Sequence, residues 1–89
     1  MQNNLLDGKT IVVTGGATGI GQAFALTSAA YGARVMIADM NPADETLDLI
    51  KGNGGEASYV QTDVSDAHSA QSMAEATIKW TGRIDGLVN

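Results

Sequence analysis

The stretch from Thr10 to Gly21 has the sequence TIVVTGGATGIG, in which an apolar run passes directly into a glycine-rich segment. Positions 11 to 13 are β-branched and consecutive, a pattern typical of a strand buried on both faces of a parallel sheet. Backbone without Cβ atoms can approach an anion closely, and a helix that begins at Ile20 and Gly21 directs the positive end of its dipole toward that anion. The stretch therefore predicts a strand, a phosphate-binding turn and a helix.

The spacing of the glycines narrows the class of phosphate ligand. The pattern is Gly15-x-x-x-Gly19-x-Gly21, which differs from the more common G-x-G-x-x-G. No lysine follows as a Walker P-loop requires, so the sequence argues against a nucleoside triphosphatase. With Thr14 in front, TGGATGIG resembles the T-G-x-x-x-G-x-G of the short-chain dehydrogenase/reductase family, and LDGK at 6–9 resembles the segment before that family's first strand. The resemblance extends along all 89 residues.

The rest of the chain alternates strands and helices. We expect further strands at 34–38 and 57–62, the latter polar enough for an edge, and the start of a fourth within 83–89. Helical spacing predicts three sheet-facing sets of side chains: Ile20, Ala23, Phe24, Thr27 and Tyr31; Ala43, Leu47 and Ile50; and Ala70, Met73, Ala74, Thr77 and Ile78. Asn41 followed by Pro42 is expected to cap the second helix, and Ser65 or Asp66 the third.

This alternation predicts the fold class. The chain is expected to be α/β, with a Rossmann-like doubly wound parallel sheet, the element order β-α-β-α-β-α-β and the strand order 3-2-1-4. Residues 1–89 would form the N-terminal part of a single dinucleotide-binding domain whose C-terminal catalytic half is absent.

Asp39 follows the second predicted strand and is the second position that indicates a nucleotide site. A carboxylate there can accept both ribose hydroxyls of an adenosine, although it could also turn the chain or cap the next helix. A 2′-phosphate about 4 Å away would be repelled by up to about 4 kcal/mol per unit charge. No Lys or Arg occurs in 15–21 or at Met40 and Asn41 to reverse that sign, so Asp39 favours NAD over NADP.

The family resemblance implies further cofactor contacts. Gly15, Gly19, Ile20 and Gly21 would hold the pyrophosphate, and the Thr18 hydroxyl would contact the adenosine ribose or only stabilise the turn. Asp63 and the backbone N–H of Val64 would contact adenine, unless Asp63 serves only an Asx turn with Ser65. Asn89 resembles the first residue of the family's N-N-A-G, which supports the sheet and lines the cofactor groove.

Catalytic residues are not expected in this chain. The family transfers hydride with a Ser and a Tyr-x-x-x-Lys, but Tyr31 and Tyr59 lack a lysine four residues later. His68 is expected to be an exposed helix residue rather than a ligand, and no metal site is expected. Trp80 and Met73 are expected to pack a helix on the sheet.

Composition limits the remaining possibilities. The net charge of −5 gives no nucleic-acid footprint, and no apolar run is long enough for a membrane span. The N-terminus lacks the features of a signal peptide, so a cytoplasmic protein is expected. The resemblance implies a homodimer or homotetramer for the parent protein, whereas the 89 residues alone would expose the fourth strand and self-associate or be partly unfolded.

Three functional hypotheses follow. The first is the cofactor-binding segment of an NAD-dependent short-chain oxidoreductase that interconverts alcohols and ketones, with this chain inactive by itself. The second is a stand-alone, non-catalytic module that binds NAD or an adenine nucleotide. The third is a methyltransferase-type nucleotide domain, which shares the acidic residue after the second strand but predicts a different glycine spacing.

Overall fold

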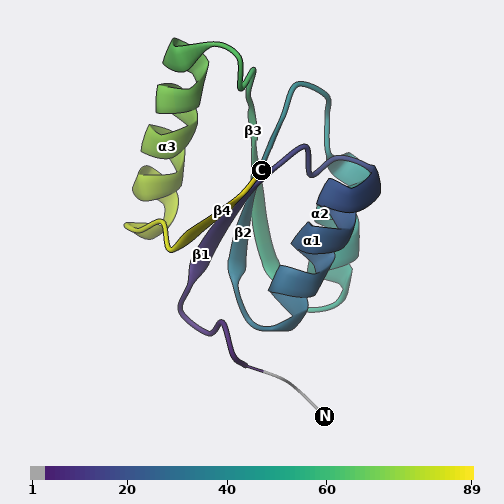
Figure 1. Ribbon diagram of the computed structural model, residues 1–89. Helices are drawn as coiled ribbons and strands as arrows, with labels where there is room; N and C mark the ends of the chain where they lie inside the picture. The colour runs from purple at the N-terminus through teal and green to yellow at the C-terminus, as the bar shows by residue number, and fades with distance from the viewer. Residues whose placement is uncertain (1–3) are drawn as a thin grey trace.

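The computed structural model describes residues 4–89, which form a four-stranded parallel sheet with helices on both faces (Figure 1). Strand order is β3-β2-β1-β4, as the sequence predicts, and the polar third strand lies at an edge. The elements are β1 (Thr10–Thr14), α1 (Gly19–Ala30), β2 (Arg34–Asp39), α2 (Asp44–Gly52), β3 (Glu56–Gln61), α3 (Ala67–Thr81) and β4 (Gly86–Val88). Within residues 4–89, no helix combines the length and apolarity needed to cross a lipid bilayer.

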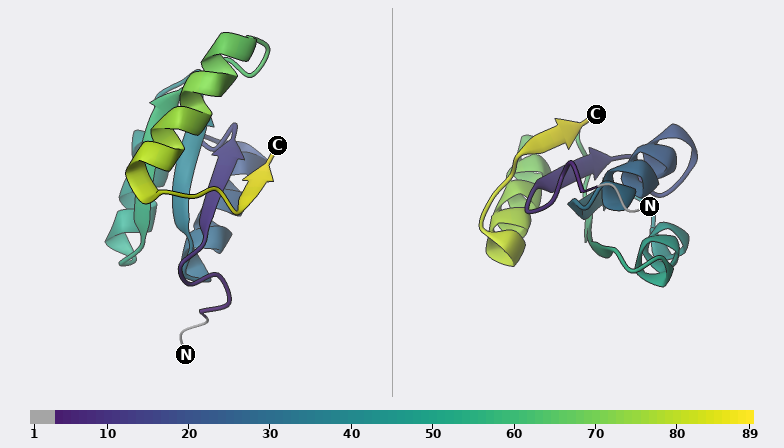
Figure 2. Two further views of the ribbon diagram at one scale, coloured as in Figure 1. Left: turned by 90° about the vertical axis from the view of Figure 1, so that its left-hand side faces the viewer. Right: turned by 90° about the horizontal axis from the view of Figure 1, so that it is seen from below.

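The sheet has a core on each face because successive strand side chains point to opposite sides. Helices α1 and α2 cover one face and α3 the other, as the end-on view in Figure 2 shows. Val13 and Ile37 are buried in the cluster beneath α1 and α2. On the opposite face, Met73 and Trp80 of α3 pack with Val12 and its neighbours, so their predicted packing role is confirmed.

The predicted sheet-facing side of α1 is wrong. Ile20 and Phe24 are 77% and 49% exposed, whereas Ala25 is fully buried. The small Ala25 side chain lets the helix axis come close to the strands, and Leu26 packs at the margin of the same core. Ala23 and Thr27 are exposed as well.

Two smaller predictions, the N-cap of α2 and the orientation of Ile78 in α3, are also wrong. Ala43, not Asn41, is the N-cap residue of α2, because the Asn41 N–H donates to Oδ1 of Asp39 and holds that residue in the preceding turn. Asp66 caps α3 by accepting from the N–H groups of His68 and Ser69, which decides between the two candidates. His68 is exposed as expected, but Ile78 points away from the sheet.

Strand β4 is attached to β1 through an aspartate. The Thr10 N–H donates to Oδ2 of Asp85 (2.8 Å), and the Asp85 N–H donates to the Thr10 carbonyl oxygen (2.8 Å). Arg83 donates to the same carboxylate from Nε (2.8 Å) and Nη2 (2.7 Å). The hydrogen bonds from the Arg83 side chain and from the Thr10 backbone hold the pKa of Asp85 below its ordinary value.

Asp85→Asn is expected to make stability less dependent on pH in acid. A carboxylate whose pKa is lowered by folding stabilises the protein above the unfolded pKa, and that stabilisation is lost as the pH falls through the folded pKa. The variant should therefore have a lower free energy of unfolding than the wild type at pH 7. The difference between the two should shrink below about pH 4. Urea unfolding at pH 7, 5 and 3 measures this, with exposed Asp48→Asn as the control. An equal gap at all three pH values would contradict the expectation.

Candidate functional site

The glycine-rich turn joins the carboxyl end of β1 to the start of α1. Gly15 and Gly19 have φ angles of 68° and 59°, in the left-handed region that side-chain-bearing residues rarely adopt. A Cβ atom at Gly21 would overlap the carbonyl oxygen of Gly15, so the first turn of α1 sits directly on the loop. Three glycines of the motif are thus required by the backbone path itself.

The amino end of α1 is open at this turn. Thr18 is the N-cap residue, with extended backbone, and its hydroxyl makes no capping hydrogen bond. The N–H groups of the first helical turn have no carbonyl partner one turn earlier in the helix, and they carry the positive end of the dipole. Gly19 and Ile20 are exposed there. The arrangement offers backbone donors to an anion.

Asp39 links the end of β2 to the glycine-rich turn. Its Oδ2 accepts a hydrogen bond from the Ala17 N–H (2.9 Å), and its Oδ1 accepts from the Asn41 N–H (2.9 Å). The carboxylate therefore does help to turn the chain, but it does not cap α2. Its backbone is fixed too, since its carbonyl oxygen accepts from the Tyr59 hydroxyl and the Thr62 N–H (both 3.0 Å).

A hollow of about 360 Å³ lies at the carboxyl ends of β1, β2 and β3. It is lined by Thr14, Gly15, Ala38, Asp39, Met40, Asn41, Thr62, Asp63 and Val64. The structure thus brings Gly15, Asp39, Asp63 and Val64 to one cavity, while 18–21 lie outside its lining. Asn89 also lies outside it, but its side-chain oxygen accepts from the hydroxyl of Thr14, a lining residue (2.9 Å).

Asp63 forms the Asx-type turn that the sequence allowed as an alternative. Its Oδ1 accepts from both the hydroxyl (2.6 Å) and the N–H (3.0 Å) of Ser65. These two hydrogen bonds, the hydroxyl's first, lower the pKa of Asp63, so the side chain is a carboxylate at neutral pH. Both bonds end on Oδ1, which leaves Oδ2 as the oxygen for a ligand.

Two residues that the sequence analysis did not identify support the turn from α1 and α2. The Thr46 hydroxyl donates to the carbonyl oxygen of Gly16 (2.8 Å), and the Gln22 amide donates to Thr46 Oγ1 (3.0 Å). The sequence held one signal for the role of Thr46. Thr46 is a polar residue three positions after Ala43 and four before Ile50, so helical spacing places it on the same buried face.

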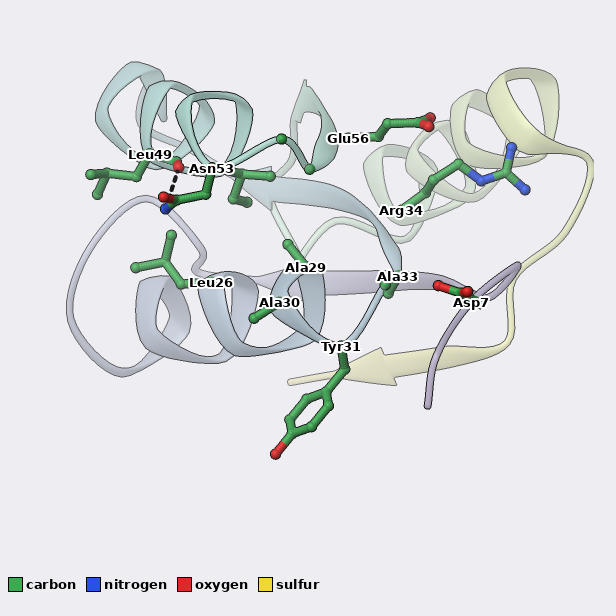
Figure 3. Close-up of a pocket in the computed structure, with 14 residues that line it drawn as sticks. Asp7, Leu26, Ala29, Ala30, Tyr31, Ala33, Arg34, Leu49, Asn53 and Glu56 are labelled. Carbon is green, nitrogen blue, oxygen red and sulfur yellow. Dashed lines mark hydrogen bonds between the residues drawn. The ribbon is translucent and has the colours of Figure 1, made fainter. Parts of the chain in front are cut away.

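A larger hollow, of about 690 Å³, lies at the opposite end of the sheet (Figure 3). It runs between the carboxyl ends of α1 and α2, where Leu26 and Leu49 face each other, and Tyr31 points away from them. Open parallel sheets bind ligands outside the carboxyl ends of their strands, where the smaller hollow gathers its carboxylates beside the glycine-rich turn. We therefore assign the candidate site to the smaller hollow.

Neither tyrosine is placed to act as a general base in this hollow. Tyr59 donates its hydroxyl proton to the Asp39 carbonyl, and its pKa is raised by burial and by the charges of Asp39 and Asp44. A raised pKa makes loss of the proton at neutral pH harder. Tyr31 lines the hollow at the other end of the sheet.

Comparison with known proteins identifies the family. Residues 9–89 match the model of the short chain dehydrogenase family. The chain is 48% identical over 86 residues to the uncharacterized oxidoreductase YxbG of Bacillus subtilis, covering 94% of this chain and 32% of that protein. A crystal structure of hydroxysteroid dehydrogenase from Escherichia coli superposes with a TM-score of 0.92 at 36% identity, covering 94% of this chain and 37% of the other.

A second solved structure carries a cofactor. A short chain dehydrogenase/reductase from Burkholderia phymatum in complex with NAD matches with a TM-score of 0.87 and 34% identity, over 92% of this chain and 30% of its own. The present chain thus spans about a third of the length of these relatives. The family match over residues 9–89 agrees with the strand order β3-β2-β1-β4 and with the T-G-x-x-x-G-x-G spacing of the turn. The chain therefore belongs to the short-chain dehydrogenase/reductase family.

Proposed function

We propose that these 89 residues are the N-terminal, NAD-binding part of a short-chain oxidoreductase. The observation that carries the proposal is the Asp39 carboxylate, which is hydrogen-bonded to the glycine-rich turn and lines the same hollow as Asp63 and Val64. An exposed end of a glycine-rich turn, a carboxylate and a hollow of about 360 Å³ are thus contiguous, which supports a dinucleotide as the ligand. The NAD complex of the Burkholderia phymatum relative supports the choice of a nicotinamide dinucleotide.

In the proposed complex, successive parts of the dinucleotide would contact successive groups of residues. Gly15, Gly19, Ile20 and Gly21 would hold the pyrophosphate through backbone N–H groups and the α1 dipole. Asp39 would accept the adenosine ribose hydroxyls, and the Thr18 hydroxyl, which makes no capping bond, would be a second ribose contact. When bound, the cofactor supplies the acceptor or donor of a hydride.

The adenine would lie at the carboxyl end of β3. Oδ2 of Asp63 would accept from its amino group, and the N–H of Val64 would donate to a ring nitrogen. Asn89, held against Thr14 at the end of β1, would line the groove on the nicotinamide side. These contacts leave the chemistry to residues outside the hollow described here.

The sign of the local charge favours NAD over NADP. Asp39 has only uncharged neighbours in Met40 and Asn41, and the turn from 15 to 21 contains no cation to neutralise a 2′-phosphate. A carboxylate that is already fixed by two N–H groups cannot move away from an added phosphate without breaking those bonds.

The reaction proposed for the parent protein is the reversible oxidation of a secondary alcohol to a ketone. The residues described here would supply cofactor binding, and the catalytic Ser and Tyr-x-x-x-Lys would come from a further part of the protein. A homodimer or homotetramer is the proposed assembly of the parent. Edge strand β4 and exposed Leu87 would make the 89 residues self-associate when alone.

Asp39→Asn is expected to relax the preference for NAD. The amide oxygen can still accept from Ala17, but the negative charge that repels a 2′-phosphate is gone. The ratio of the NADPH to the NADH dissociation constant should fall by about tenfold or more, with a smaller change at high salt because salt screens the charge. Fluorescence titration of the complete protein with both cofactors measures the ratio.

Exposed Asp48→Asn removes the same charge from α2 outside the hollow and serves as the matched control. It should leave the ratio within about twofold, since the charge of an exposed side chain outside the hollow is screened by solvent and salt. An unchanged ratio in Asp39→Asn would remove Asp39 as the selecting residue. Absence of NADH binding by the wild type would overturn the proposed function.

Gly21→Ala tests the close contact between α1 and the turn. The added methyl group would overlap the Gly15 carbonyl, so α1 must move away and its N–H groups leave the phosphate position. We expect NADH affinity to fall by at least about tenfold. Gly52→Ala is the control, because a Cβ there meets no atom within 4 Å. Similar affinities for the two variants would contradict the expected phosphate site.

A further inference from the structure

Thr46 connects helix α2 to the glycine-rich turn through its hydroxyl group. The side chain is fully buried. Its Oγ1 donates to the carbonyl oxygen of Gly16 at 2.8 Å, and the carbonyl oxygen of Ala17 is a second, longer acceptor at 3.2 Å. Its lone pairs are used as well, since the Gln22 amide of α1 donates to Oγ1 at 3.0 Å. One hydroxyl thus joins α1, α2 and the turn.

One of these two residues, Ala17, is also held from the other side of the turn by Asp39. The Ala17 N–H donates to Asp39 Oδ2, while the neighbouring carbonyl groups accept from Thr46. The turn is therefore fixed between the end of β2 and the first half of α2. Any rotation of the Gly16–Ala17 backbone would break bonds on both sides.

We propose that Thr46 is a positioning residue for cofactor binding, which holds the glycine-rich turn in its binding geometry before the dinucleotide arrives. This inference rests on the proposed function. Preorganised donors bind more tightly because the entropy of ordering the turn is lost during folding rather than during cofactor binding. Thr46 also keeps Ala17 against Asp39, so it acts on the ribose acceptor and on the phosphate-binding backbone together.

A second buried threonine makes only a local hydrogen bond and so offers a comparison. Thr77 of α3 is also fully buried, but its hydroxyl donates to the Met73 carbonyl four residues earlier in its own helix (2.9 Å). That bond is local, whereas the Thr46 bond reaches back 30 residues to the turn. Thr77 therefore provides a control of equal burial and chemistry that lies outside the turn.

The test compares Thr46→Val, Thr46→Ser and Thr77→Val in the complete protein, by NADH fluorescence titration and thermal unfolding. Valine removes the hydroxyl donor while keeping the shape of the side chain. We expect NADH binding to weaken by about tenfold, which is the free-energy equivalent of one buried hydrogen bond. Serine keeps the hydroxyl and should restore affinity to within about threefold of the wild type. Thr77→Val should bind NADH like the wild type even if it melts at a lower temperature.

The outcomes separate this inference from the proposed function. Wild-type affinity in folded Thr46→Val, with only a lower melting temperature, would show a structural role and overturn the inference while NAD binding stands. Failure of Thr46→Ser to restore affinity would also overturn it. A wild type that does not bind NADH removes both proposals.

A second variant covers the case in which Thr46→Val does not fold. Gln22→Ala leaves Thr46 in place but removes the amide that orients its hydroxyl. It should weaken NADH binding by about threefold and speed amide exchange at Ala17, whose N–H is bonded to Asp39. Unchanged affinity and unchanged exchange would overturn the inference.

Discussion

The hydrogen bond from the Ala17 N–H to the Asp39 carboxylate is the interaction on which the site depends. It joins the turn after β1 to the end of β2, two neighbouring parallel strands whose carboxyl ends lie at the same edge of the sheet. The Gly15 N–H, donating to the Ala38 carbonyl at 2.8 Å, adds a second bond between the same two segments. The glycine-rich turn is therefore held against β2 as well as following from β1.

That constraint explains the small side chains of α1. A turn held so close to β2 brings the helix that follows it down onto the sheet, with Gly21 against the Gly15 carbonyl and Ala25 fully buried. Two bulky residues of the helix, Ile20 and Phe24, are then left on its outer side, while Leu26 still packs against the core. The apolar residues of α1 thus belong to two different surfaces, one against the sheet and one facing outward.

Much of the fold could be predicted from the sequence, because consecutive β-branched residues and glycine breaks mark buried strands without reference to distant contacts. Strand order followed from the alternation of strands and helices in a doubly wound sheet, and the edge position of β3 from its polar side chains. The packing of Met73 followed from helical spacing. The face of α1 did not, since periodicity shows which residues are apolar but not which apolar surface meets the sheet. The role of Thr46 also could not be predicted, because its acceptor lies 30 residues away and depends on how α2 crosses the turn.

If Asp39 binds the ribose as proposed, its carboxylate serves two purposes, and this has a consequence for cofactor preference. Its oxygens already accept from Ala17 and Asn41, so the same group that would meet the ribose also maintains the shape of the turn. A substitution that only changes charge, such as an amide, retains one acceptor, whereas a small apolar residue would remove the charge and release the turn together. Under the proposed function, cofactor preference and the geometry of the glycine-rich turn would therefore be coupled. An effective change of preference would need to replace the acceptor for Ala17 while supplying a cation for the 2′-phosphate, and the exposed Met40 and Asn41, which line the hollow beside Asp39, are the positions from which that cation could come.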